Sequence, residues 1–311
     1  ELRHILAQVA ALPANLVVRA SYEIAVTARL GWQPLTHPST SSEPIFVRDL
    51  ALMRRNPDYA WLFLFHPNGH AREAALDMIQ TPPMSPFFLS ALIWRLNDWA
   101  KPVRLAAERC LERVRQQIPA DVAASAAPYL LDRRHTWGRW STEANLLDHV
   151  FGRKDVLAIF AAFVQRTANG PLGNYLRHAL RYDGIDEHLP ALAASAVQPQ
   201  VRVIAYQCLL AGSLSWPAGL EWQWIDKVYG IRKRLPKFES RPLSGASAEP
   251  DLFWQAARDK SVIVRRAAAD ALIAARTPVP DRERLIAHLM QDDSPSVRSR
   301  ADFLRRHPPT T

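Results

Sequence analysis

Two segments near the end of the sequence share one pattern, in which a polar turn containing aspartate leads into a Val-Arg step and an Ala-rich apolar run. The first reads Asp259-Lys260-Ser261-Val262-Ile263-Val264-Arg265, and the second reads Asp292-Asp293-Ser294-Pro295-Ser296-Val297-Arg298. The two arginines, Arg265 and Arg298, are 33 residues apart. A fixed period of this length is typical of helical repeat arrays, because each helix pair buries its apolar face against its neighbours.

The same pattern recurs earlier in the chain at similar intervals. Arg104 and Arg202 each follow a valine and a polar turn, and Arg72 stands in the equivalent place 32 residues before Arg104. Weaker copies are indicated at 137–140 and 170–176, and the 63 residues from Arg202 to the next clear copy are close to two periods. No segment alternates with a period of two over a useful length. The sequence therefore predicts an all-α fold, with antiparallel helix pairs stacked into a right-handed α-α superhelix.

Proline content and the apolar pattern divide the chain into three parts. Residues 1–36 are predicted to form N-terminal helices, because their apolar residues recur at helical spacing. Residues 37–44 contain two prolines and several Ser and Thr residues, which predicts a linker. Residues 45–311 are predicted to form the repeat array, interrupted by an insertion at about 221–250.

This insertion differs from the rest of the chain in composition. Five basic side chains lie within the eleven residues 231–241, against a single acid, and aromatic residues flank them. Cations interleaved with aromatic rings suit phosphate contact and base stacking, and a solvated insertion with its rings packed on a neighbouring repeat is the alternative interpretation. We expect a basic loop in place of the second helix of one repeat, with solvent-exposed cations. The candidate binding residues are Trp222, Trp224, Tyr229, Arg232, Lys233, Arg234, Lys237 and Arg241.

The turn aspartate, the Val-Arg step and the following Ala-Ala-x-x-Ala-Leu pattern resemble the HEAT repeat, in the short form found in many bacterial proteins. The resemblance covers roughly residues 45–305. It implies an armadillo-type α-solenoid that acts as a non-enzymatic scaffold or adaptor, with a protein partner on its concave face or on the basic insertion. The residues that carry it are Asp98, Val103, Arg104, Val201, Arg202, Asp259, Val264, Arg265, Asp292, Val297 and Arg298.

The aspartates and arginines of this pattern have an expected structural role. An aspartate in the turn can accept hydrogen bonds from the free N–H groups at the start of the following helix. An arginine after the valine can reach an aspartate or a carbonyl oxygen of the next turn. Repeated along the chain, these contacts would form a ladder, and we therefore expect these residues to be structural rather than ligand-binding.

The net charge of +9 favours acidic partners, such as nucleic acid, anionic lipid or an acidic protein face. Nucleic-acid binding is the alternative to a protein partner. No run of about 18 apolar residues is present, so no transmembrane segment is predicted. The two cysteines, Cys110 and Cys208, fall on apolar helix faces, and we expect a reducing, cytoplasmic location. The sequence begins at Glu1 without a methionine, which suggests a trimmed start.

The sequence contains no catalytic signature. It has no nucleophile elbow, phosphate-binding loop or dinucleotide-binding glycine motif, and we expect no catalytic residue and no cofactor. His66 and His70 are four residues apart, the spacing of two ligands on one helix face. Pro67 and Gly69 interrupt a helix between them, so we expect no metal site.

One enzymatic alternative comes from the same resemblance. Some HEAT-like bacterial proteins are DNA glycosylases for alkylated purines, with an aspartate, an arginine and tryptophans in a basic cleft. Trp94, Asp98 and Trp99, together with Arg104 or Arg139, form a loosely similar set. Asp98 is also the turn aspartate of its own repeat, so we keep the glycosylase as a remote alternative to the structural role.

Overall fold

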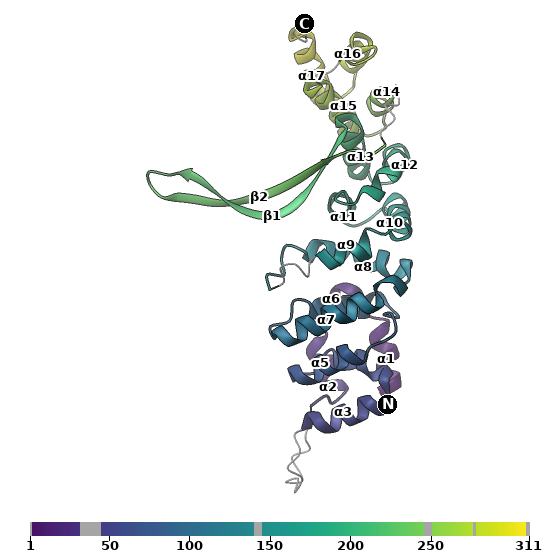
Figure 1. The fold of residues 1–311 in the computed structure, drawn as a ribbon. Helices are drawn as coiled ribbons and strands as arrows, with labels where there is room; N and C mark the ends of the chain where they lie inside the picture. The colour runs from purple at the N-terminus through teal and green to yellow at the C-terminus, as the bar shows by residue number, and fades with distance from the viewer. Residues whose placement is uncertain (1, 32–44, 140–144, 246–250, 276–277, 309–311) are drawn as a thin grey trace. The chain divides into compact units, whose positions relative to one another are not determined.

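The structure is a computed structural model in which helices make up most of the chain (Figure 1). It describes residues 2–31, 45–139, 145–245, 251–275 and 278–308. The predicted linker at 37–44 lies outside the described residues. The chain divides into two compact units, Glu1–Val156 and Leu157–Thr311. Within the described ranges, no helix is long and apolar enough to cross a membrane.

The first unit consists of short helices that pack against one another in succession. Its elements are α1 (Leu2–Ala10), η1 (Ala14–Leu16), α2 (Ser21–Thr27), α3 (Ile45–Arg55), η2 (Pro57–Tyr59), α4 (Ala60–Phe63), α5 (Gly69–Met78), α6 (Pro86–Arg95), α7 (Lys101–Val114), η3 (Arg115–Gln117), α8 (Ala120–Arg133) and α9 (Leu146–Phe151). Helix α5 packs on α3 and α7, and α6 packs on α7 and α8. The predicted N-terminal helices belong to this unit, because α1 and η1 also pack on α6.

Aromatic side chains fill the core of the first unit. Trp61 and Phe63 of α4 and Phe87 and Phe88 of α6 are at most 2% exposed. The rings of Trp61 and Phe88 lie 5.6 Å apart between centroids. Full burial of a large apolar side chain contributes about 1.5–3 kcal/mol, so this aromatic layer is a main source of the unit's stability.

The second unit also has packed helices, and it contains the two strands of the described chain. Helix α10 (Lys154–Arg166) crosses the boundary between the units. The remaining elements are α11 (Leu172–Ala179), η5 (Asp183–His188), α12 (Leu189–Ser195), α13 (Pro199–Ala211), β1 (Ser213–Asp226), β2 (Ile231–Pro242), α14 (Leu252–Ala257), α15 (Val262–Ala274), α16 (Arg282–Met290) and α17 (Pro295–Arg306). Helix α13 packs on α11, α12 and α15, and α15 packs on α17.

Five arginines of the predicted repeats contact the turn that precedes their own helix. Each donates hydrogen bonds from Nη1 to the carbonyl oxygens six and five residues earlier in the chain, at 2.6 to 3.4 Å. Each guanidinium therefore satisfies carbonyl groups of the turn that leads into its helix. The arginines are Arg72, Arg104, Arg202, Arg265 and Arg298.

Three of these arginines also bind an aspartate in a later turn through two hydrogen bonds. The pairs are Arg72 with Asp98, Arg202 with Asp259, and Arg265 with Asp292. Each of the three aspartates also accepts a hydrogen bond, at 2.7 to 3.0 Å, from the backbone N–H two residues further on. The predicted structural role of these residues is confirmed at these three pairs.

The segment predicted to be a basic loop is instead an antiparallel β-hairpin of β1 and β2. The expectation that the chain holds no strand was therefore wrong for residues 213–242. A strand that buries one face shows alternating apolar and polar residues. Most side chains of both strands are exposed or only partly buried, and the alternation is confined to short runs such as Leu220–Trp224. The fold is mostly helical, with one two-stranded sheet.

The hairpin also does not replace a helix of the predicted array. Arg72 and Asp98 are separated by 26 positions, and Arg265 and Asp292 by 27, whereas Arg202 and Asp259 are separated by 57. The Arg202–Asp259 separation exceeds the Arg265–Asp292 separation by 30 positions, which is the length of segment 213–242. Because α13 also packs directly on α15, the long interval after Arg202 is one period plus an insertion, and not two periods.

Candidate binding arm

We call the β1–β2 hairpin, residues 213–242, the arm. It starts where α13 ends at Gly212, whose φ of 61° is in the left-handed region that favours glycine at a helix C-terminus. The Leu243 N–H donates to the Gly212 carbonyl at 3.0 Å and closes the base. Both ends of the arm therefore leave the helices at the same point, and Figure 1 shows the hairpin extending away from α11 and α13.

Arg241 of β2 fastens the base of the arm to the helices. Its guanidinium makes two hydrogen bonds with Asp186 of η5, at 2.6 and 2.7 Å, and two more with the carbonyl oxygens of Leu180 and Tyr182. Asp186 is buried and also accepts the Ser244 N–H at 2.8 Å. A charged pair with this many hydrogen bonds is strong and geometrically specific. Arg241 therefore anchors the arm, whereas the basic composition of the segment predicted that Arg241 is a binding residue.

Apolar packing and a backbone contact complete the base. Leu214 of β1 lies opposite Arg241 and is fully buried. Arg181 donates to the Pro217 carbonyl at 3.2 Å. Beyond Pro217 the register shifts before pairing resumes at Leu220, and such a bulge increases the local twist of a hairpin. The contacts with the helices thus lie at the base, and the part from Leu220 to the turn is the distal arm.

The turn at the tip has a specific sequence cause. Asp226 Oδ1 accepts hydrogen bonds from the N–H groups of Val228 and Tyr229, at 2.8 and 3.0 Å. Gly230 follows with a φ of 66°. An aspartate that bonds to the backbone ahead of it and a glycine in the left-handed region are both typical turn residues. Together they reverse the chain and bring Ile231 opposite Asp226.

One face of the distal arm combines tryptophans with arginines. Trp222 lies opposite Arg234, and Trp224 lies opposite Arg232, and directly opposed residues project from the same face of a hairpin. The guanidinium carbon of Arg232 lies 4.6 Å from the centre of the Trp222 ring, and that of Arg234 lies 5.7 Å away. Both distances are within the range of cation–π attraction, so the arginines are held against the ring.

The predicted binding residues other than Arg241 and Lys237 come together on the distal arm, Lys237 lies just beyond the Leu220–Pro236 pair toward the base, and all seven are exposed. Trp222 and Trp224 are each 55% exposed, and Tyr229 is 80% exposed. The cations predicted to face solvent do so; Lys237 also lies 3.6 Å from Glu239 in an exposed ion pair. They are Arg232, Lys233, Arg234 and Lys237. The predicted end of the insertion, at 246–250, lies outside the described residues.

Composition alone missed the aliphatic residues of the arm. Four large aliphatic side chains are exposed there, and Val228 at the tip is 89% exposed. Such exposed apolar groups mark contact surfaces when they cluster. The signal that could have found them is the Asp226 to Gly230 turn, which predicts that its neighbours sit at a hairpin tip. The four are Leu220, Ile225, Val228 and Ile231.

The aspartate of the glycosylase alternative, Asp98, is buried in a structural cluster, whereas Trp99 and Arg139 are exposed. The Asp98 side chain is 1% exposed and accepts hydrogen bonds from Arg72, Arg95 and the Ala100 N–H. Burial by itself would raise the pKa of Asp98, but the hydrogen bonds from Arg72 and Ala100 and the nearby charges outweigh it and lower the pKa. Burial also lowers the pKa of Arg95 to about 10, against the attraction of Asp98. This geometry uses the Asp98 carboxylate internally.

His66 and the two cysteines are also enclosed by the protein, whereas His70 is exposed. His66 is buried, with Nε2 at 2.9 Å from Asp49 Oδ2 and Nδ1 accepting the Asn68 N–H. Burial raises the pKa of both Cys110 and Cys208 to about 12, so their thiols stay protonated near neutral pH. Among the residues that the structure describes, no three His, Cys, Asp or Glu side chains are placed to hold a metal ion.

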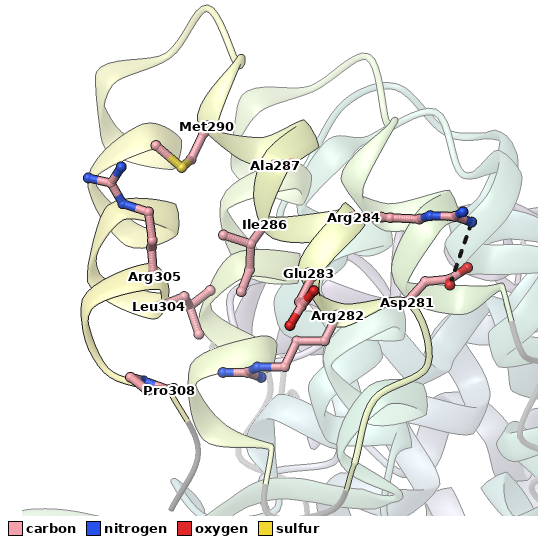
Figure 2. A pocket seen from close by; sticks show the side chains of 10 residues that line it. All are labelled: Asp281, Arg282, Glu283, Arg284, Ile286, Ala287, Met290, Leu304, Arg305 and Pro308. Carbon is pink, nitrogen blue, oxygen red and sulfur yellow. Dashed lines mark ion pairs between the residues drawn. The ribbon is translucent and has the colours of Figure 1, made fainter.

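A groove on α16 and α17 is a further concave feature of the second unit. It has a volume of about 890 Å³, and Ile286, Met290 and Leu304 line it (Figure 2). Its rim carries charged side chains with partners inside the protein. Arg282 donates to the Leu272 carbonyl, and Arg284 lies 3.9 Å from Asp281. Arg282 and Arg284 thus have partners within the protein, and the groove belongs to different helices from those that hold the arm.

Comparison of the sequence with models of known protein families found no match, and comparison with curated protein sequences found none either.

Proposed function

We propose that the chain is a non-enzymatic scaffold or adaptor of the HEAT-repeat type, whose helices hold out the arm as a binding element. The recurring arginine contacts support the repeat assignment, because the same donor positions and offsets recur at five places along the chain. Stacked helix pairs of this kind give a rigid support to which an inserted element can be attached.

The observation that carries this proposal is the contrast between the two ends of the arm. At the base, Arg241 and Leu214 are held by the helices. In the distal part, Trp222, Trp224 and Tyr229 are more than half exposed. Exposing such large apolar surface opposes folding, because burial of that surface is the main driving force for it. An anchored element that keeps this surface in solvent is suited to contact another molecule.

A protein is the partner class implied by the HEAT resemblance. One test uses a photoreactive amino acid in place of Tyr229, with the same replacement at Trp99 as a matched control, because Trp99 is 71% exposed on the first unit. After irradiation in cells that produce the protein, we expect covalent adducts from position 229 that are absent from position 99. Equal adduct formation at both positions, or none at position 229, would contradict a protein partner on the arm.

Nucleic acid is the second candidate partner, favoured by the placement of Arg232 and Arg234 against the Trp222 ring. Aromatic rings can stack on bases while arginines neutralise phosphates. Titration with single-stranded and duplex oligonucleotides at two salt concentrations tests this candidate. A steep loss of affinity with salt would support it, and no binding at low salt would exclude it.

A further inference from the structure

The distal arm ends in a group of exposed apolar side chains. At the end of the hairpin lie Ile225, Val228, Tyr229 and Ile231, with exposed fractions of 60, 89, 80 and 53%. Val228 and Tyr229 are the two most exposed large apolar side chains of the described residues. The end that reaches furthest from the helices therefore carries the most exposed apolar side chains of the arm, next to the exposed Lys227 of the turn.

A band of tryptophans and cations lies immediately behind this apolar tip. It contains the pairs Trp224–Arg232 and Trp222–Arg234, and Lys233 opposite Gln223. Tryptophan prefers the boundary between lipid headgroups and acyl chains. Lysine and arginine near a membrane surface are attracted to anionic lipids. The apolar end matches the acyl boundary of an anionic bilayer, and the band behind it matches the headgroup layer above that boundary.

The dimensions fit shallow insertion only. From the turn to the Trp224 layer the arm covers about three residue layers, which at roughly 3.3 Å each is about 10 Å. Interfacial elements bury their apolar side by about 5–10 Å into the headgroup and acyl boundary. The Asp226 carboxylate at the tip opposes deeper entry, although it already bonds to the Val228 and Tyr229 N–H groups. The outer edges of the two strands also keep unpaired backbone groups, which do not enter the hydrocarbon core.

We propose that the tip of the arm inserts into the interfacial layer of an anionic lipid bilayer, with Val228 and Tyr229 at the acyl boundary and the Trp/Arg band among the headgroups. This inference rests on the proposed role of the arm as a binding element and names its target. Nucleic acid explains the cations but not the tip, because Ile225 and Val228 neither stack on bases nor contact phosphates. Aliphatic groups at the leading end have a favourable place in a bilayer.

Co-flotation with lipid vesicles tests the proposal. The full chain is mixed with vesicles of phosphatidylcholine alone or with added phosphatidylglycerol. We expect binding to the anionic vesicles that falls as salt is raised, because the headgroup attraction is screened. Binding to neither vesicle would overturn the proposal.

Substitutions in the tip and in the band of tryptophans and cations separate the apolar and electrostatic contributions to vesicle binding. Tyr229→Asp should weaken binding to anionic vesicles roughly tenfold, because one aromatic side chain no longer leaves water. Tyr22→Asp is the matched control, since Tyr22 is 73% exposed on the first unit, and it should change nothing. Arg232→Gln and Arg234→Gln should each cost about fivefold, whereas Arg284→Gln, at an 81% exposed side chain on α16, should have no effect. Binding unchanged by Tyr229→Asp would overturn tip insertion.

A fluorophore at the tip reports insertion directly. The native thiols of Cys110 and Cys208 are buried, so a thiol-reactive, environment-sensitive dye labels Val228→Cys selectively. Anionic vesicles should shift the emission of this dye to the blue. A dye on Ser240→Cys, which is exposed near the base of β2, should show no shift. Equal shifts at both positions, or none at Val228→Cys, would contradict insertion of the tip.

A parallel titration with single-stranded oligonucleotide distinguishes failure of this inference from failure of the proposed function. One outcome is that oligonucleotides bind, that this binding depends on Arg232 and Arg234 but not on Tyr229, and that vesicles do not bind. This outcome would overturn bilayer insertion and keep the arm as a binding element. If vesicles and oligonucleotides do not bind and crosslinks from position 229 are absent, both proposals fail. Vesicle binding with the expected loss in Tyr229→Asp supports both.

Discussion

Arg202 of α13 and Asp259, which lies 57 positions further along the chain, are joined by two hydrogen bonds of 2.8 Å each. The Arg202 and Asp259 side chains are only 2% and 9% exposed. The whole arm lies between these two residues in the sequence, yet the contact has the same donor atoms as those of Arg72 and Arg265. The helices on the two sides of the arm are thus joined as if the arm were absent from the sequence.

Asp259→Asn should destabilise the second unit substantially. The change leaves the Arg202 guanidinium buried without its counter-charge, and breaking a buried pair in this way costs about 3–5 kcal/mol. Urea unfolding followed by circular dichroism measures the loss. The exposed pair Arg109–Asp77, with side chains 54% and 46% exposed, provides the control, and Asp77→Asn should cost less than about 1 kcal/mol. Similar losses in both variants would contradict the structural role of Arg202.

Arg241→Ala should loosen the base of the arm. Its removal leaves Asp186, whose side chain is 5% exposed, with a buried charge and fewer hydrogen bonds, at a cost of about 2–3 kcal/mol. Amide hydrogen exchange should then speed up at Leu243, whose N–H closes the base. Lys237→Ala on the same strand is the control and should change stability by less than about 0.5 kcal/mol. An unchanged exchange rate at Leu243 would show that Arg241 does not anchor the arm.

Asp98→Asn tests whether this residue is structural or catalytic. Two buried guanidiniums, of Arg72 and Arg95, depend on its charge, so we expect a loss of about 3 kcal/mol or more in unfolding free energy. Release of alkylated bases from DNA is measured in parallel for the Asp98→Asn variant and for the unsubstituted protein. Base release that is abolished by Asp98→Asn while stability is retained would contradict the structural assignment.

The Arg265–Asp292 pair predicts a loss of stability in acid. The hydrogen bond from Arg265 is the largest cause of the lowered pKa of Asp292, and it outweighs the opposing effect of burial. Because the folded-state pKa is below the unfolded value of about 3.9, this stabilisation is present above that pH and is lost as pH falls through the folded-state pKa. Asp292→Asn should lower the unfolding midpoint temperature near pH 7 and make a smaller difference near pH 2.5. A constant difference across this range would contradict the assignment.

The helices and their arginine contacts could be predicted because they repeat. A position such as Arg265 is uninformative alone, but the same step at Arg298 and Arg202 defines a period and an apolar helix face. The predicted bonds from an arginine to the aspartate of the next turn follow from that period, whereas the bonds to carbonyl oxygens of the arginine's own preceding turn were not predicted. These local and recurrent contacts leave a clear pattern in the sequence.

The arm could not be predicted in the same way, because it repeats nothing and buries little. Trp222 and Trp224 alternate with polar residues, but two tryptophans alone do not define a strand. The anchoring role of Arg241 depends on Asp186, which is 55 positions earlier in the chain, and no local pattern joins them. The composition of the segment did locate the exposed cations of the arm, because charge density does not depend on whether the backbone is a loop or a hairpin.

The most direct test of this account is to shorten the arm and measure unfolding. Ser215 and Ser240 are opposed in the hairpin, so residues 216–239 can be replaced by Asn-Gly, which favours a two-residue turn and keeps Leu214, Arg241 and Asp186. If the arm is an insertion between directly packed helices, the variant should keep its helical circular dichroism and unfold cooperatively within about 5 °C of the full chain. Loss of cooperative unfolding would show that the arm is an integral part of the helical core and contradict the account.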